Sequence, residues 1–300
     1  MESKISTNVR SFSNHVQRKL DFAKRKPEFL AAVAENLFFT PTRSFPSRKE
    51  KDVLATGVEK TFRMGNREIH YWHWDRGGEL VFLVHGWNGH SGNLSRFVEP
   101  LLAEGFSIVS FDLPGHGVSG GRHNSLPLSA QTLIQLTEIV GVPYAFLAHS
   151  FGGAIATLAM EKGLEVKQAV YISPPLRLED FRYEFCNYMN FDFDTMEKMK
   201  ARIEKRFNFS LEYLNTAELG KNLNTKLLVI HDKDDDEVPY SKGEKVAKSW
   251  KSAELISTEG LGHKMILRSP DIIEKTIRFI KEGLVSSDSG VTKGVSVLRV

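Results

Sequence analysis

Cysteine is nearly absent from this 300-residue chain. The single cysteine, Cys186, excludes an intramolecular disulfide, and a chain without disulfides is typical of a reducing compartment. No apolar run reaches the roughly 18 residues that a membrane-spanning helix needs. The first residues, Met-Glu-Ser-Lys, lack the apolar stretch of a secretory signal. We therefore expect a cytoplasmic protein.

A strong charge of one sign is also missing. The net charge is +3, from 40 Lys and Arg against 37 Asp and Glu. Residues 1–52 hold 11 basic and 6 acidic side chains, whereas the rest of the chain holds 29 basic and 31 acidic ones. Nucleic-acid-binding proteins favour a concentrated basic face. The slightly acidic body therefore predicts no nucleic-acid partner.

Motifs that bind metals or phosphates are missing too. His116, His123, His149 and His231 do not stand at the spacing of metal ligands, and the chain has no Gly-x-x-x-x-Gly-Lys-Ser/Thr loop. We expect no metal site and no cofactor. What is present is an ordinary globular composition, 41% hydrophobic and 26% charged, in a chain long enough for one large core.

Residues 1–52 are expected to form an N-terminal helical extension. Apolar residues recur at helical spacing from Val9 to Leu20 among basic ones, and a second apolar run covers 29–39. A basic amphipathic helix can lie on a membrane surface, so weak contact with a membrane is one prediction. A helix that packs on the body with a solvated basic face is the other.

From residue 57 onward, short apolar runs alternate with longer helical patterns. The expected strands are 61–64, 68–74, 80–84, 106–111, 144–148, 169–172, 227–230 and 255–257. The expected helices lie near 92–104, 127–140, 151–163, 239–250 and 270–282. This alternation predicts a parallel sheet covered on both faces, and the first two strands predict an antiparallel hairpin. We expect an α/β fold with a mostly parallel, doubly wound sheet of about eight strands.

One interval, 174–222, breaks the alternation, because a single crossover helix needs far fewer residues. Its aromatic and methionine content predicts a small helical insertion. The insertion would divide a core formed by 53–173 and 223–285. The tail, 286–300, has the composition of a loop.

The segment around Ser150 joins an apolar strand directly to a helical pattern. Two small residues, Ala148 and Gly152, stand two positions before and after Ser150. A sharp strand-to-helix turn requires small residues there, because the flanking backbones come close together, and it would lift the Ser150 hydroxyl above the sheet. The segment resembles the nucleophile elbow of the α/β-hydrolase family, with Ala148 where Gly is commoner. A serine that merely caps the helix is the alternative.

Two further loops resemble the same family. The apolar run that ends in His85-Gly86-Trp87 resembles the oxyanion loop, which implies that the backbone N–H groups of Trp87 and Phe151 form an oxyanion hole. His85 is expected to hold that loop rather than to react. The segment Asp112-Leu-Pro-Gly-His-Gly-Val-Ser resembles the Asp-x-Pro-Gly-x-Gly-x-Ser loop of the family, which implies an architectural role.

The acid of a catalytic triad is expected in a turn that is crowded with five acidic residues. The family pattern resembles His-Gly-x-x-Asp-x-x-Val-Pro, with the acid four residues after the histidine and four before the proline. Both His231 and Pro239 then select Asp235. The glycine of that pattern is replaced here, so Asp234 and Asp236 stay open as alternatives.

The base is expected at His263, in a glycine-rich loop between the last strand and the last helix. The order Ser150, Asp235, His263 is that of the family, and the resemblance covers about 60–282. It implies a serine hydrolase that cleaves an ester or related acyl bond of a small hydrophobic substrate, similar to carboxylesterases or lysophospholipases. A thioesterase, another acyl-transfer enzyme or C–C hydrolase, or a non-catalytic binding module on this scaffold are the alternatives.

The insertion at 174–222 resembles the cap that covers the site in this family. Its apolar side chains could form a hydrophobic acyl pocket. They could equally form the core of the cap itself.

Overall fold

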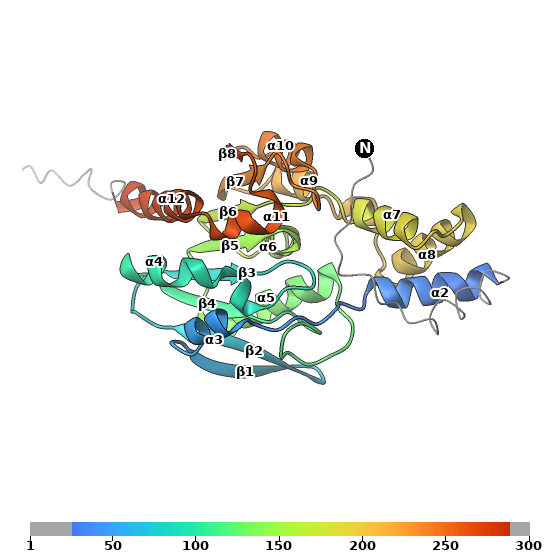
Figure 1. The fold of residues 1–300 in the computed structure, drawn as a ribbon, viewed down its shortest axis with the longest axis horizontal. Coiled ribbons are helices and arrows are strands. Elements are labelled where there is room, and N and C mark those ends of the chain that lie inside the picture. The colour runs from blue at the N-terminus through green and yellow to red at the C-terminus, as the bar shows by residue number, and fades with distance from the viewer. Residues whose placement is uncertain (1–25, 289–300) are drawn as a thin grey trace, which may run out of the picture.

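The computed structural model describes residues 26–288. Its centre is an eight-stranded sheet in the order β1-β2-β4-β3-β5-β6-β7-β8 (Figure 1). The strands are β1 (Val58–Met64), β2 (Arg67–Trp74), β3 (Leu80–Val84), β4 (Ser107–Phe111), β5 (Ala145–His149), β6 (Gln168–Ile172), β7 (Lys226–Asp232) and β8 (Ala253–Thr258). β1 and β2 are antiparallel, and the pairs from β4 to β8 are parallel. The expected fold class is confirmed.

The central strands are buried on both faces. Alternate residues of β3 and β5 point to opposite sides, so Phe82 and Phe146 lie in one apolar cluster while Leu83 and Leu147 lie in another. This explains why these strands are continuous apolar runs in the sequence rather than alternating ones. The edge strand β1 is mostly exposed instead.

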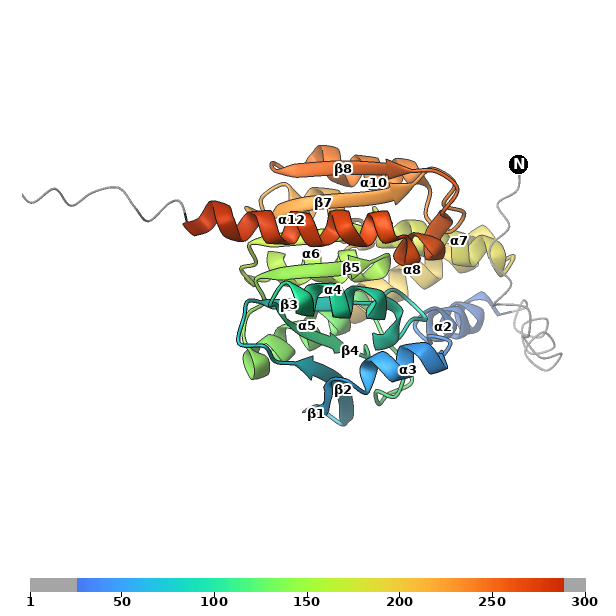
Figure 2. The same cartoon turned by 60° about the vertical axis from the view of Figure 1, so that its left-hand side comes forward.

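Helices cover both faces of the sheet (Figure 2). The helices are α2 (Pro27–Phe38), α3 (Arg48–Leu54), η2 (Ser91–Phe97), α4 (Val98–Ala103), α5 (Leu126–Val140), α6 (Phe151–Glu161), α7 (Leu178–Tyr188), α8 (Phe193–Phe207), η3 (Leu211–Tyr213), α9 (Thr216–Gly220), α10 (Tyr240–Ser249), α11 (Gly262–Met265), η4 (Ile266–Arg268) and α12 (Pro270–Asp288). α3, α4 and α12 pack on one face, and α5, α6 and α10 pack on the other. Within residues 26–288, no helix is long and apolar enough to cross a membrane.

Two expected helices differ from those observed. The pattern at 92–104 predicts one helix, but the structure has the 3-10 helix η2 followed by the short α4. Pro100 explains the break, because it lacks the N–H that a continuous helix would donate to the residue-96 carbonyl and its ring crowds that carbonyl. The last helix continues beyond the expected end at residue 282 to Asp288. Extending an established helix adds one hydrogen bond per residue, so weak helix formers can be included.

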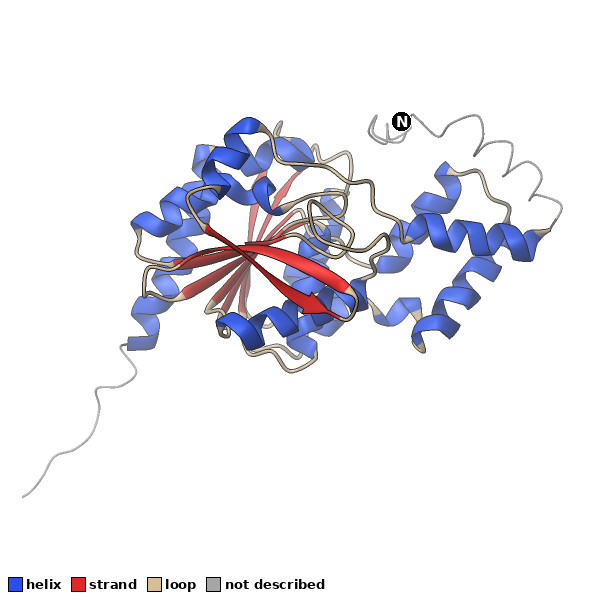
Figure 3. Ribbon diagram, turned by 90° about the horizontal axis from the view of Figure 1, so that it is seen from below, coloured by secondary structure: helices blue, strands red, loops and turns tan. Residues whose placement is uncertain are grey.

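The insertion begins and ends as one small two-stranded closure. Arg177 and Asn215 form an antiparallel bridge, the Leu178 amide donates to the Leu214 carbonyl, and helices α7, α8 and η3 lie between. Seen from below, this helical group extends to one side of the sheet (Figure 3).

The N-terminal part of the described chain packs against the insertion. α2 lies beside α8 (Figure 1). The carboxylate of Glu35 is buried between them, 2.9 Å from Arg202 Nε and 3.0 Å from Arg206 Nη1. Of the two predictions for the extension, packing on the body therefore holds for α2. The helix expected between Val9 and Leu20 lies outside the described residues.

We predict that Glu35→Gln loosens the contact between α2 and α8. The neutral amide cannot satisfy two guanidinium groups, so the free energy of unfolding should fall by about 1–2 kcal/mol, discounted because both arginines are partly exposed. Urea denaturation measures the change. Glu212→Gln, which removes an exposed partner of Lys200 on the same helix, should leave the midpoint unchanged. Equal effects of the two substitutions would contradict a special role for Glu35.

Candidate active site

Ser150 occupies a strained turn between strand and helix. β5 ends at His149 and α6 begins at Phe151, so Ser150 alone makes the connection. Its backbone has φ 51° and ψ −123°, a region that residues other than glycine rarely adopt and that costs of the order of 1–3 kcal/mol. The Ser150 amide donates to the Ile172 carbonyl of β6, which holds the turn against the sheet.

Glycine is required at position 152 by a close approach of backbone. A Cβ there would lie 2.3 Å from the carbonyl oxygen of Val84 and 3.0 Å from that of His85. The start of α6 therefore packs directly on the end of β3. The sequence predicts crowding between the two flanks of the turn, but in the structure the crowding atoms belong to β3.

The loop after β3 lies over Ser150. A Cβ on Gly86 would be 3.0 Å from Ser150 Cβ, and the ring centroids of Trp87 and Phe151 are 5.3 Å apart. The Phe151 N–H belongs to the first turn of α6 and has no acceptor within the helix. The structure thus brings the two residues named as oxyanion donors together beside Ser150.

His85 and His116 are structural. The Leu113 amide donates to His85 Nε2, and His85 Nδ1 donates to the Gly86 carbonyl. His116 accepts from the Asn88 amide in the same way. Burial lowers the pKa of each histidine to about 3, so both rings are neutral.

Asp112 is structural as well. Its two carboxylate oxygens accept from the amides of Ser91 and Val118, at 2.6 and 2.8 Å. Both oxygens are therefore engaged by backbone, in agreement with the architectural role expected for this loop.

Asp235 and His263 form a buried hydrogen-bonded pair. Asp235 Oδ2 lies 2.8 Å from His263 Nδ1, and Asp235 Oδ1 accepts from the amides of Glu237 and Val238. Burial by itself would raise the pKa of Asp235, but hydrogen bonds from His231, His263 and Val238 lower it well below the ordinary range. The carboxylate is therefore charged at neutral pH and holds the imidazole in one orientation.

The neighbouring aspartates have other partners. Asp234 accepts from the Gly260 amide, and Asp236 is exposed. Asp232, which replaces the glycine of the family pattern, is buried and accepts from the Thr258 hydroxyl and the Leu261 amide. It therefore joins the loop that carries Asp235 to the loop that carries His263.

His149 is a site residue that the sequence reasoning considered only as a metal ligand. Its Nε2 donates to the His263 carbonyl at 3.0 Å, and the two rings are 4.6 Å apart. Burial lowers the pKa of His149 far below its ordinary value, so the ring is a neutral donor. The residue before Ser150 thus ties the elbow to the histidine loop. Its position at the end of β5 is the signal that could have identified it.

The Ser150 hydroxyl and His263 lie at the same sheet edge but are not directly bonded. Within residues 26–288, no hydrogen bond joins the two side chains. Hydrogen bonds of this kind are often long before substrate binds. Glu237, which no sequence pattern singled out, places its carboxylate 3.9 Å from His263 Nε2 and pairs with Lys264.

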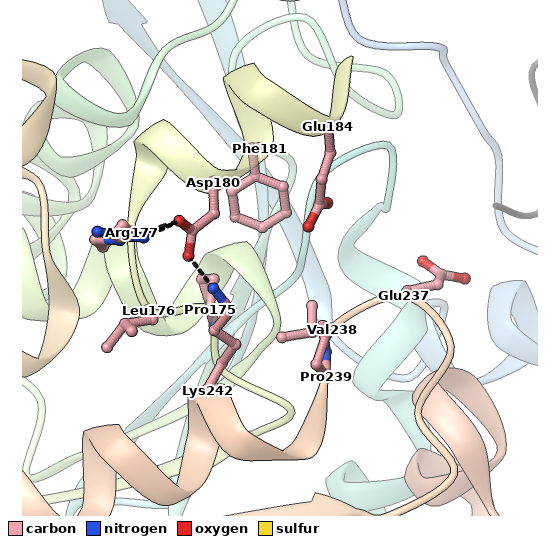
Figure 4. Close-up of a pocket in the computed structure, with 10 residues that line it drawn as sticks. All are labelled: Pro175, Leu176, Arg177, Asp180, Phe181, Glu184, Glu237, Val238, Pro239 and Lys242. Atoms are coloured by element: carbon pink, nitrogen blue, oxygen red, sulfur yellow. Dashed lines mark hydrogen bonds and ion pairs between the residues drawn. The ribbon is translucent and has the colours of Figure 1, made fainter. Parts of the chain in front are cut away.

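A cleft opens between the insertion and the start of α10 (Figure 4). Leu176, Phe181 and Val238 provide apolar lining, and Glu184 and Glu237 provide carboxylates. Asp180 bonds both Arg177 and Lys242, which links α7 to α10 across the cleft.

Most apolar side chains of the insertion pack within it or against α2. Cys186, Met199 and Ile203 are fully buried, and Phe185 and Phe207 contact Phe38 and Phe39 of the N-terminal segment. Phe181, by contrast, lies over the site, with its ring 6.5 Å from that of Phe151. Within the described chain, no group of three or more His, Cys, Asp or Glu side chains could hold a metal ion.

Comparison with family models gives two adjoining matches. Residues 77–216 match the model of serine aminopeptidase S33, and 212–291 match that of TAP-like protein, a C-terminal α/β-hydrolase segment. Together the two matches cover all the strands from β3 to β8 and the insertion.

Individual relatives are more distant. The chain is similar to human serine hydrolase-like protein 2, with 27% identity over 48% of each chain. It is also similar to the pimeloyl-[acyl-carrier protein] methyl ester esterase of Xylella fastidiosa, with 36% identity over 29% of this chain and 35% of that protein. The matched parts are thus less than half of either relative. Among solved structures, the Pyrococcus furiosus esterase Pf2001 shares the fold with a TM-score of 0.60 and 18% identity, over 81% of this chain and 98% of that one.

We predict that Gly152→Ala damages this site more than Gly153→Ala. The added methyl group at 152 meets backbone oxygens, which cannot move aside, and the free energy of unfolding should fall by about 1–3 kcal/mol. At position 153 the nearest atoms are 3.3 Å away on the Tyr171 ring, so the loss should be smaller. Urea denaturation of both variants tests this. A more stable Gly152→Ala than Gly153→Ala would show that β3 and α6 are not in close contact.

Proposed function

Because the chain belongs to the α/β-hydrolase family, we propose that it is a serine hydrolase that cleaves an ester or related acyl bond through an acyl-enzyme on Ser150. The observation that carries the proposal is the buried 2.8 Å pair of Asp235 and His263, which lies beside the strained Ser150 turn. Backbone strain and a buried charged pair are both unfavourable unless they serve a site.

His263 acts as the general base. Asp235 accepts the Nδ1 proton of His263, so the lone pair of the neutral ring is on Nε2. Nε2 takes the proton of the Ser150 hydroxyl as its oxygen attacks the acyl carbonyl. The imidazolium that forms is stabilised by the charged Asp235.

The amides of Trp87 and Phe151 stabilise the oxyanion. The negative charge develops on the former carbonyl oxygen when Ser150 adds to it. Donors that are already in place need no reorganisation, and the loss of one such donor typically costs roughly 2.7–4 kcal/mol. The close packing at Gly152 supports a rigid arrangement of these amides.

His263 then completes the reaction. The imidazolium gives its proton to the leaving oxygen as the acyl–oxygen bond breaks, and an acyl-enzyme remains on Ser150. A water molecule, activated by His263, attacks the acyl carbon and releases the acid. Ser150 recovers its proton from His263.

The insertion acts as a cap over the substrate. Phe181 stands over Phe151, and Leu176 and Val238 line the adjoining cleft, which favours a small hydrophobic acyl group. Because most other aromatic side chains of the insertion pack among themselves and on α2, they do not add to the acyl pocket.

We predict that Ser150→Ala abolishes turnover of p-nitrophenyl butyrate, because the nucleophile is lost while the fold is retained. The release of p-nitrophenol measures activity, and circular dichroism checks the fold. Ser173→Ala is a matched control: Ser173 also follows a strand with positive φ (52°), and its hydroxyl is buried without a hydrogen-bond partner. It should keep wild-type turnover.

A fluorophosphonate probe gives a second measurement. It should label the wild-type protein and Ser173→Ala, but not Ser150→Ala. Absence of labelling in folded wild-type protein would favour a non-catalytic binding module instead.

We predict that Asp235→Asn lowers turnover by about 10³–10⁴-fold, because an amide favours the wrong tautomer of the histidine. Asp236→Asn removes an adjacent charge that is exposed and should change turnover less than twofold. Steady-state kinetics at fixed pH compares them. Similar losses in the two variants would refute the assignment of Asp235 as the acid.

A further inference from the structure

A second pocket, of about 190 Å³, lies where three parts of the chain meet. Phe39 follows α2, Arg67 begins β2, Asn124 precedes α5, and Phe207 ends α8. N-terminal segment, hydrolase core and insertion therefore all contribute to its wall. No residue of the candidate active site lines it.

Asn124 presents an unused hydrogen-bond donor in this wall. The residue is only 1% exposed. Its Oδ1 accepts from the Ser125 amide at 2.9 Å and from the Ser129 hydroxyl at 2.8 Å, which fixes the orientation of the side-chain amide. Nδ2 is then left buried without a partner. A buried donor without an acceptor is unfavourable by about 1–3 kcal/mol, so a ligand that accepts from it would be stabilised.

Arg67 presents a second unused donor, and it carries a positive charge. Its Nε is buried and has no hydrogen-bond partner among the described residues. No acidic residue lines the pocket. The nearest buried carboxylate, Glu35, is already bound by Arg202 and Arg206, and the Arg206 guanidinium stands over the rings of Phe39 and Phe207. The polar wall therefore consists of donors and positive charge.

The opposite wall is apolar. Phe39, Leu128 and Phe207 line it. An engineered apolar cavity of about 150 Å³ holds benzene, so a pocket of this size suits a molecule of roughly eight non-hydrogen atoms. An inorganic anion would leave the apolar wall without contact, and a neutral molecule would leave the Arg67 charge unpaired.

We propose that this pocket binds a small organic anion, with its carboxylate on Asn124 Nδ2 and Arg67 and a short apolar tail against Phe39 and Phe207. Binding there would connect the N-terminal segment, the core and the insertion through one ligand. The proposal does not depend on catalysis at Ser150.

Isothermal titration calorimetry of the full 300-residue chain with hexanoate tests the proposal. Hexanoate should bind and raise the melting temperature. Asn124→Asp keeps the acceptor that Ser125 and Ser129 need but sets a carboxylate in place of the donor, so affinity should fall at least tenfold. Arg67→Met should lower affinity at least tenfold as well and decides the matter if Asn124→Asp does not fold. Arg63→Met, an exposed arginine of β1, is the matched control and should bind like the wild type.

Several results would overturn the proposal. Hexanoate that binds equally to wild type, Asn124→Asp and Arg67→Met would occupy another place, such as the candidate active site. Hexanol that binds as tightly as hexanoate would rule out recognition of charge. Inorganic phosphate that binds while hexanoate does not would rule out the apolar tail. No heat and no thermal shift with millimolar hexanoate would leave the pocket to water alone.

Discussion

The close approach between the start of α6 and the end of β3 is the constraint on which the candidate site depends. Gly152 lies so near the Val84 carbonyl that no side chain fits between them, and Ser150 must therefore make its turn in a strained conformation. The same approach sets Trp87 beside Phe151. The strain is tolerable because β5 and α6 are among the most deeply buried elements of the protein, and their packing energy far exceeds it.

Buried carboxylates organise the other half of the site. Asp235 is charged in spite of its burial because two backbone amides and two histidines surround it. Asp232 performs a related task one strand-end earlier, where it binds Thr258 and Leu261 of the histidine loop. These bonds connect the ends of β7 and β8, and His149 connects that loop to β5. The loops around the site are thus held together by hydrogen bonds between strand ends.

The N-terminal segment and the insertion depend on each other. Glu35 of α2 is buried only because Arg202 and Arg206 of α8 neutralise it, and Phe38 and Phe39 pack on aromatic side chains of the insertion. A substitution in α2 can therefore alter the insertion that covers the cleft at Phe181. The 190 Å³ pocket lies on this same junction, so an occupant there would act on both segments.

The order of strands and helices, the hairpin and the Ser150 turn could be predicted from the sequence, because burial on both faces produces continuous apolar runs and a sharp turn demands small neighbours. Those signals are local along the chain. The choice of Asp235 over its acidic neighbours rested on a family pattern, and its distance from His263 follows from which loops meet across β7 and β8. The roles of His149, Asp232 and Glu237, and the assignment of the insertion's aromatic side chains to α2 rather than to the cleft, could not be predicted. Each depends on contacts between segments far apart in the chain, which leave no spacing in the sequence to detect.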